Sequence, residues 1–210
     1  MRMRKKKNLG PRMQAASAVL VTEPETLRGR WLTEPFRELR LELGCGKGSF
    51  TAGTAAAEPD VLLAAVEKVP DAMVMAMEKA VAASLENVRF IDMDAARVCE
   101  VFAPGEVARI YINFCDPWPG SRHAKRRLTA PSFLKSYAEV LAPGGEIHFK
   151  TDNVPLFDWS LETFAAEGWE VSEVTHDLHA AGPVGVMTDY EAKFFAEGKP
   201  ICRCVARKKA

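Results

Sequence analysis

Residues 41–48 read Leu-Glu-Leu-Gly-Cys-Gly-Lys-Gly, an apolar segment that stops at three alternating glycines. Glycine lacks a Cβ, so the backbone can turn sharply there and approach a ligand closely. The stretch therefore predicts a strand-to-helix turn that binds a nucleotide-like cofactor. The dinucleotide fingerprint GxGxxG would require glycine at Ser49, so the pattern is GxGxG preceded by Glu42. A tight turn without a ligand is the alternative.

Four further apolar runs follow along the chain, and each of them also ends on a carboxylate. The five runs end at Glu42, Glu67, Asp94, Asp116 and Asp152. Their spacings of 25, 27, 22 and 36 residues leave room for a helix between successive strands. The sequence therefore predicts an α/β fold with a doubly wound, mostly parallel sheet. In such a sheet the carboxyl ends of the strands share one edge, where ligands bind.

Helical periodicity supports this alternation of strands and helices. Two helices are predicted from apolar faces, the first formed by Met73, Val74, Met77 and Val81, the second by Phe133, Leu134, Tyr137, Val140 and Leu141. A third is predicted from near Leu156 to Glu167, ending at Gly168. Residues 169–175 and 201–206 have no long helix between them, which predicts an antiparallel strand near the C-terminus.

The composition is that of a globular protein, with 48% hydrophobic and 27% charged residues and a formal net charge of zero. The charges are segregated. Residues 1–12, 122–127 and 207–209 hold 13 of the 28 basic residues and no acid, which leaves 15 basic against 28 acidic residues elsewhere. Local basic patches on an acidic body suit a polyanionic partner. We expect residues 1–210 to form a single domain with a basic amino-terminal arm over about residues 1–12.

The five cysteines are odd in number and form no CxxC pair, which indicates reduced thiols rather than disulfides or a zinc site. The basic start and the apolar run 15–21 resemble a signal peptide only faintly, because Thr22-Glu23-Pro24 replaces a small-residue cleavage site. No apolar run approaches the ~18 residues of a membrane span. The sequence predicts a cytoplasmic protein with no metal and no membrane partner, and it leaves open whether the protein is a monomer or a homodimer.

The acidic strand ends suit one kind of cofactor. Glu67 follows the second strand, where an acid can accept hydrogen bonds from ribose hydroxyls, and Asp94 could accept an adenine amino proton after the third. Each alone could equally be a solvated strand end or a capping residue. Together, acids in one crevice would repel one another without a ligand that offers donors or positive charge. S-adenosylmethionine offers ribose hydroxyls, an amino group and a sulfonium cation.

The fourth run continues into a cationic segment. Asp116 is followed by Pro117, which cannot extend a ladder, so the strand is predicted to stop there with its carboxylate at the carboxyl end. Trp118 offers a π-face for a base, and four cations within residues 122–127 offer phosphate contacts. The segment is either an active site joined to a nucleic-acid surface or a strand exit followed by a solvated loop.

Together these motifs resemble the S-adenosylmethionine-dependent methyltransferases, and in particular the bacterial tRNA (guanine-46-N7-)-methyltransferases, the TrmB family. The resemblance covers nearly the whole chain. Its segments are Met1–Arg4, the glycine turn, Asn87–Ala95, Asp116–Pro119, Arg122–Thr129, His148–Asn153 and Met187–Glu191. Asp-Pro-Trp followed by Arg-His-x-Lys-Arg-Arg is highly specific as a combination.

The resemblance implies an enzyme that methylates N7 of a guanine in the variable loop of tRNA, with S-adenosylmethionine as donor and tRNA as partner. The catalytic residue would be Asp116. The methyl donor would contact Glu42, Gly44, Gly46, Gly48, Glu67, Asp94 and Asp116. The guanosine would be held by Asp152, Thr188, Asp189, Tyr190 and Glu191, and the tRNA by Arg122, His123, Lys125, Arg126 and Arg127.

Two positions depart from the family pattern. Gly120 stands where the family commonly has Lys, at a position associated with substrate binding, and Cys115 stands where Pro or Ser is usual. Three rival functions are a methyltransferase acting on a base amino group, a non-catalytic RNA-binding protein with a degenerate cofactor site, and a dehydrogenase. The basic run 122–127 disfavours the first, the retained glycine turn and acids the second, and Ser49 the third.

Overall fold

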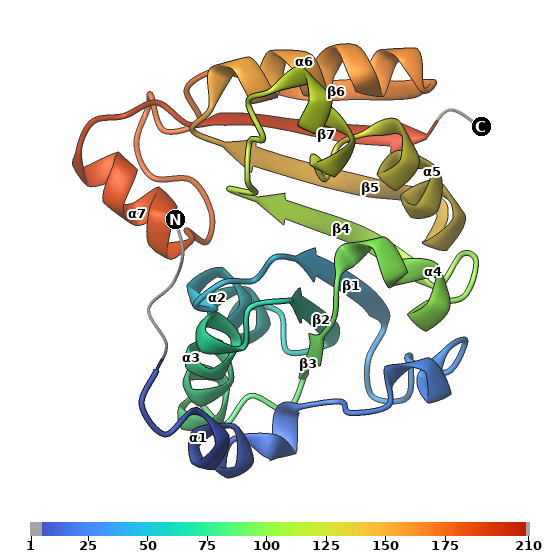
Figure 1. Ribbon diagram of the computed structural model, residues 1–210, viewed down its shortest axis with the longest axis vertical. Helices are drawn as coiled ribbons and strands as arrows, with labels where there is room; N and C mark the ends of the chain where they lie inside the picture. The colour runs from blue at the N-terminus through green and yellow to red at the C-terminus, as the bar shows by residue number, and fades with distance from the viewer. Residues whose placement is uncertain (1–5, 209–210) are drawn as a thin grey trace.

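A seven-stranded sheet forms the centre of the computed structural model, which describes residues 6–208 (Figure 1). Its strand order is β3-β2-β1-β4-β5-β7-β6. The strands are β1 (Glu38–Leu43), β2 (Val61–Glu67), β3 (Val88–Asp92), β4 (Val107–Asn113), β5 (Leu141–Thr151), β6 (Trp169–Thr175) and β7 (Cys202–Lys208). Strands β1 to β5 are parallel, and β7 is antiparallel to β5 and β6. The predicted fold class is confirmed.

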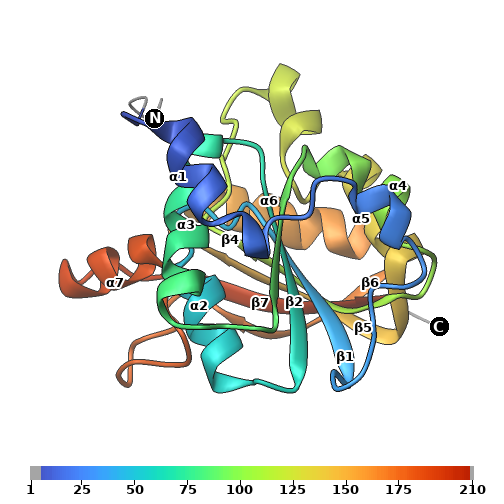
Figure 2. The ribbon, with the colours of Figure 1, turned by 90° about the horizontal axis from the view of Figure 1, so that it is seen from below.

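Helices cover both faces of the sheet, and Figure 2 shows α1–α3 on one side and α4 and α5 on the other. The α-helices are α1 (Leu9–Ala15), α2 (Ser49–Ala57), α3 (Pro70–Ala82), α4 (Val98–Val101), α5 (Pro131–Val140), α6 (Val154–Ala166) and α7 (Asp189–Ala196). Short 3-10 helices are η1 (Ser17–Val19), η2 (Pro24–Leu27), η3 (Ala95–Arg97) and η4 (Ser121–Arg126).

The two larger apolar cores hold these layers together. One packs α4, α5 and α6 against the sheet and includes Tyr137 and Phe157, and the other packs α3 against β2 and β3 and includes Met73 and Phe90. All seven residues of β2 are buried, because this strand lies between β1 and β3 and helices cover both faces of the sheet. The arrangement leaves the carboxyl ends of the parallel strands free to carry polar side chains.

Two strands end earlier than the sequence predicts. β4 stops at Asn113, where Phe114 takes a left-handed conformation with φ 52°, so the predicted continuation to Asp116 is wrong and Pro117 is not what ends the strand. β3 stops at Asp92, and Asp94 instead caps η3 by accepting a hydrogen bond from the Ala96 N–H at 3.0 Å. Both carboxylates therefore lie on loops beyond the sheet.

The helices also differ in detail from their predicted faces. Val81 is 42% exposed, because the buried face of α3 continues through Ala76 and Ala80 instead. Leu141 belongs to β5 rather than to the preceding helix, since its extended backbone ends α5 at Val140. The short helix α7 between β6 and β7 was not predicted.

The described part of the basic amino-terminal arm is attached to the body. Arg12, in α1, donates two hydrogen bonds of 2.6 Å to the Glu78 carboxylate on α3. The Lys6 N–H donates to the Asp71 carboxylate at 2.5 Å. Residues 1–5 of the predicted arm, which include the Met1–Arg4 segment of the family resemblance, lie outside the described residues, as does Lys209.

Candidate active site

A cavity of about 1070 Å³ opens at the carboxyl ends of β1, β2, β4 and β5, where the strand order reverses around β1. About a third of the residues that line it are charged. The charged residues are Glu42, Glu67, Asp71, Asp94, Asp116, Asp152, Asp189, Lys47, Lys68, Lys125 and Arg126. The five acids predicted from the strand ends therefore line the same cavity.

The three glycines of the turn serve two different purposes. All have positive φ angles, 81° at Gly44, 57° at Gly46 and 78° at Gly48. A Cβ at Gly44 or Gly46 would meet nothing within 4 Å, and both residues line the cavity. A Cβ at Gly48 would lie 2.4 Å from Ala76 Cβ on α3, and Gly48 is not part of the lining. Gly48 therefore permits helix packing, while the other two leave room for a ligand against the backbone.

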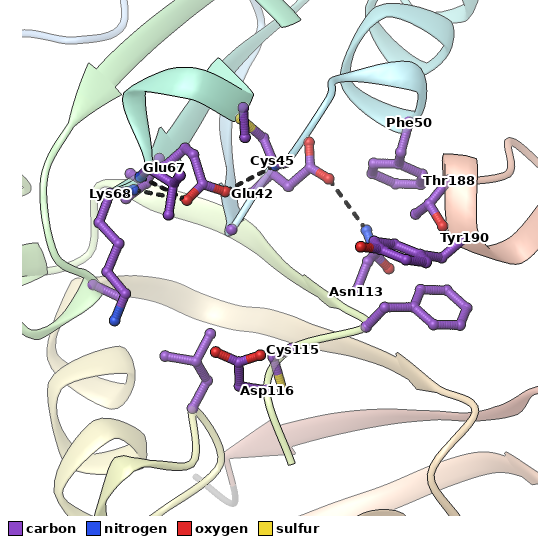
Figure 3. Close-up of a pocket in the computed structure, with 18 of the residues that line it drawn as sticks. Glu42, Cys45, Phe50, Glu67, Lys68, Asn113, Cys115, Asp116, Thr188 and Tyr190 are labelled. Atoms are coloured by element: carbon purple, nitrogen blue, oxygen red, sulfur yellow. Dashed lines mark hydrogen bonds between the residues drawn. The ribbon is translucent and has the colours of Figure 1, made fainter. Parts of the chain in front are cut away.

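Glu67 braces the glycine turn from the neighbouring strand (Figure 3). Its Oε2 accepts a hydrogen bond from the Gly46 N–H at 3.0 Å, and its Oε1 accepts from Lys68 and Val69 N–H groups at 2.9 Å each. Burial raises the pKa of the Glu67 carboxyl, and these three donors oppose the rise. Because Oε2 has one protein partner, it can still accept a hydrogen bond from a ligand hydroxyl.

Glu42 and Asn113 form a polar pair between β1 and β4 (Figure 3). The Glu42 carboxyl accepts from Thr51 Oγ1 at 2.6 Å and from Asn113 Nδ2 at 3.4 Å. Burial raises its pKa from 4.5 to about 7. Asn113 Oδ1 is buried without a hydrogen-bond partner. An unpartnered acceptor beside a buried carboxyl matches a ligand that brings N–H donors and positive charge.

Asp94 lies at the exposed rim of the cavity, in the loop after β3. Lys68 Nζ lies 3.4 Å from its Oδ2. The Ala96 N–H, by its hydrogen bond, holds the pKa of Asp94 below its usual range, despite partial burial. Its carboxylate is therefore ionised and partly engaged in capping, with an oxygen available to a ligand at the rim.

The loop after β4 carries the exposed Asp116 into the same cavity. Phe114 and Trp118, on either side of it, both have left-handed backbone, with φ 52° and 42°. The guanidinium carbon of Arg126 lies 4.9 Å from the centre of the Trp118 ring, within the range of a cation–π contact. Asp152, also exposed, follows the last residue of β5 directly. Two carboxylates from adjacent strands thus face one open region.

The predicted tRNA-binding residues do not share one environment. Arg122, Lys125 and Arg126 are exposed on η4, and His123 is half-buried with its ring 6.0 Å from that of Trp118. Arg127 points inward and is only 9% exposed. Four of the five residues can therefore reach a polyanion, whereas Arg127 contacts the protein interior.

The segment predicted to hold the guanosine forms the start of α7. Thr188 caps this helix by accepting from the Glu191 N–H at 2.9 Å. Thr188, Asp189 and Tyr190 line the cavity, but Glu191 does not. Its fully buried carboxylate accepts from Lys150 Nζ at 2.6 Å and lies 3.0 Å from His179 Nε2. Glu191 thus attaches α7 to β5 and does not reach the cavity.

Several lining residues were missed from the sequence. Asn113 is the clearest, and its signal was a polar residue inside the apolar run of β4. Phe114, Phe133 and Phe194 also line the cavity and come from three separate elements, so no local pattern marks them. Within residues 6–208 no cluster of three or more His, Cys, Asp or Glu could hold a metal ion. In that same range no helix combines the length and apolar character of a membrane span.

Comparisons with known proteins first define the class of protein to which this chain belongs. The fold resembles the crystal structure of the 16S rRNA methyltransferase KamB, with a TM-score of 0.64 at 19% identity over 87% of this chain and 89% of that one. Residues 37–204 match the family described as a putative methyltransferase. The fold is thus that of a Rossmann-like, class I methyltransferase.

Full-length relatives define the family within that class. The tRNA (guanine-N(7)-)-methyltransferase of Lactococcus lactis subsp. cremoris (strain MG1363) is 42% identical, over 99% of this chain and 98% of the relative. The enzyme of the same name from Bacillus subtilis (strain 168) is 41% identical, over 97% of each. The chain belongs to the tRNA (guanine-N(7)-)-methyltransferase family.

Proposed function

We propose that this protein transfers a methyl group from S-adenosylmethionine to N7 of a guanine in the variable loop of tRNA. The observation that carries the proposal is a single cavity with two kinds of wall. The glycine turn and buried acids form one wall, and Trp118 with Lys125 and Arg126 of η4 forms the other. The first suits a small cationic nucleoside and the second suits RNA.

The methyl donor would be held by the first wall. Glu67 Oε2 can accept from a ribose hydroxyl, Asp94 from an amino group, and Glu42 with Asn113 from a cationic ammonium. Gly44 and Gly46 admit the ligand against the backbone. S-adenosylmethionine supplies an electrophilic methyl group on its sulfonium.

The guanine would be held by Asp116 and Asp152. Guanine N7 already carries a free lone pair, so no side chain has to remove a proton. The two carboxylates can accept hydrogen bonds from the guanine N1 and N2 protons and so aim N7 at the donor site. Orientation of this kind contributes up to ~7–11 kcal/mol in well-aligned reactions. Asp116, which borders both ligands, is the residue we assign to catalysis.

The RNA would be bound by the exposed part of η4 and by the start of α7. Arg122, Lys125 and Arg126 present cations to phosphates, and Thr188 and Tyr190 line the cavity beside the guanine position. A stacked guanine must first leave its neighbours, which costs a few kcal/mol. Trp118 and the phosphate contacts can offset that cost. We expect one catalytic domain that works in the cytoplasm.

The test is to incubate the purified protein with labelled S-adenosylmethionine and unmodified tRNA, and to digest the product to nucleosides. The expected label is in N7-methylguanosine. Label in an N-methylated amino base would identify the rival methyltransferase function. Binding of tRNA without any label would identify a non-catalytic protein.

A further inference from the structure

Arg127 differs from the cations that precede it in the sequence. Arg122, Lys125 and Arg126 are exposed, whereas Arg127 is 9% exposed. Among the described residues, no carboxylate lies within 4.0 Å of its guanidinium, so it is not part of an ion pair. A buried guanidinium without a carboxylate is costly unless other groups satisfy it. Its surroundings therefore indicate what it does.

The partners of Arg127 are the backbone of the Asp116 loop and one aromatic ring. Nε lies 3.2 Å from the Pro117 carbonyl oxygen and 3.3 Å from that of Trp118, and Nη2 donates to the Trp118 carbonyl at 3.1 Å. The guanidinium carbon lies 4.3 Å from the centre of the Trp159 ring on α6. One planar group thus joins two consecutive carbonyls of the loop to a helix.

The loop to which Arg127 donates hydrogen bonds, residues 114–118, is conformationally strained. Left-handed backbone at a non-glycine residue costs on the order of 1–3 kcal/mol and persists only where the surroundings impose it. Phe114 and Trp118 both adopt it, at φ 52° and 42°, and Asp116 lies between them. The Arg127 bonds fall on Trp118 and the residue before it. They can therefore hold the turn that directs Asp116 into the cavity.

Arg126 contacts the same tryptophan through its side chain. Its guanidinium carbon lies over the Trp118 ring at 4.9 Å and it lines the cavity, while Arg127 binds the Trp118 backbone and does not line it. Consecutive arginines thus have separate tasks at one residue. The first is free to meet RNA, and the second is occupied by the loop.

We infer that Arg127 is a positioning residue, which holds the Asp116–Trp118 turn in its active geometry by joining it to Trp159 on α6, and which makes no contact with tRNA phosphates. The inference rests on the proposed function, because that function assigns Asp116 to catalysis. It corrects the expectation that all the cations of residues 122–127 bind tRNA.

The experiment compares Arg127→Ala and Arg127→Lys with Arg122→Ala and with Arg37→Ala, a control at the amino end of β1. Arg127→Ala should lower kcat by about 100-fold, the cost of misplacing a reactive group by ~1 Å. For Arg127→Ala, the salt dependence of tRNA binding should match that of wild type. Arg122→Ala should instead flatten the slope of log affinity against log salt concentration by about one unit. Arg37→Ala should change neither quantity.

Arg127→Lys keeps the charge but loses the planar guanidinium, which donates to two carbonyls at once, so it should also lower kcat markedly. It serves as the decisive variant if Arg127→Ala does not fold. Wild-type kcat in Arg127→Lys, or a salt slope flattened by one unit in Arg127→Ala, would overturn the inference.

A second readout separates this inference from the proposed function. Hydrogen exchange at the amides of residues 114–116, 118 and 120 should speed up in both Arg127 variants and stay unchanged in Arg122→Ala, whether or not tRNA is the substrate. Unchanged exchange in folded Arg127 variants would overturn the positioning role. Absence of N7-methylguanosine in the wild-type reaction would instead overturn the function.

Discussion

The acids at the ends of β1 and β2 are buried and hydrogen-bonded, whereas those after β4 and β5 are exposed. Glu42 and Glu67 are 1% and 8% exposed and are held by side chains or backbone N–H groups. Asp116 and Asp152 have open surroundings. The side of the cavity that we propose for the methyl donor is thus enclosed by the protein alone, and the side that we propose for RNA is left open.

The difference follows from the size of the two ligands. A small donor can be enclosed by a strand end and a glycine turn, and prior hydrogen bonding reduces the entropy lost on binding. A folded RNA cannot enter an enclosed pocket, so its side of the cavity must stay accessible.

The largest expected effect concerns Glu191, whose buried carboxylate lies outside the cavity and contrasts with the exposed Asp116 and Asp152. Glu191→Ala leaves Lys150 buried without its partner, so the free energy of unfolding should fall by about 3–5 kcal/mol. Denaturant unfolding measures this loss. Glu197→Ala, on the exposed end of the same helix, is the matched control and should change stability by less than about 0.5 kcal/mol. Equal stability of the two variants would show that α7 is not anchored through Glu191.

Asp116→Asn tests whether an exposed carboxylate carries the chemistry. The variant keeps the shape and loses the charge, so turnover should fall by roughly 100-fold through lost orientation. Stability should change by no more than about 0.5 kcal/mol, because the side chain is exposed. Single-turnover kinetics and thermal unfolding measure the two quantities. The control is Asp92→Asn, at the end of β3, and near-normal methyl transfer by Asp116→Asn would remove Asp116 from the mechanism.

The affinity for the methyl donor should depend on pH, because Glu42 is buried. Burial raises the pKa of Glu42 from 4.5 to about 7, so the carboxyl takes up a proton below pH 7 and no longer attracts a cation. Donor affinity should therefore fall about tenfold between pH 8 and pH 6, as the ionised fraction falls. Calorimetry at several pH values measures it.

The free energy of unfolding of the ligand-free protein should change with pH in the direction opposite to donor affinity. A raised folded-state pKa means that the Glu42 contribution is present below pH 4.5 and is lost as pH rises through about 7. Glu42→Gln should flatten both profiles. A pH-independent donor affinity in wild type would indicate that Glu42 does not face the donor's charge.

The smallest effect belongs to the exposed cations. Replacing Arg122 and Arg126 together by Ala should flatten the log–log salt dependence of tRNA binding by about two units, one for each lost phosphate contact. A salt titration of both proteins decides this, with donor affinity as the internal control. If η4 is only a solvated loop, tRNA affinity will match wild type at every salt concentration.

Much of this architecture could be predicted from local sequence. The strand spacing and the glycine turn indicated a doubly wound sheet, because alternating strands and helices have few ways to bury their apolar faces. The same logic placed Glu42, Glu67, Asp94, Asp116 and Asp152 at one edge. These residues line one cavity in the structure.

Other roles depended on contacts between residues distant in the sequence. Gly48 belongs to the glycine motif, yet Ala76 on α3 decides that it serves packing. Arg127 belongs to the basic run, yet Trp159 on α6 and the loop carbonyls draw it inward. Glu191 belongs to the guanosine segment, yet Lys150 on β5 holds its carboxylate inside.

The sequence by itself determined the order of elements, the edge at which ligands bind and the family, because periodicity and motifs are properties of neighbouring residues. Only the tertiary structure decided which side chains of each motif reach the cavity. A side chain's direction depends on partners from other elements, and the cost of burying an unpaired charge selects those partners. Adjacent residues such as Arg126 and Arg127 can therefore share one motif and have different functions.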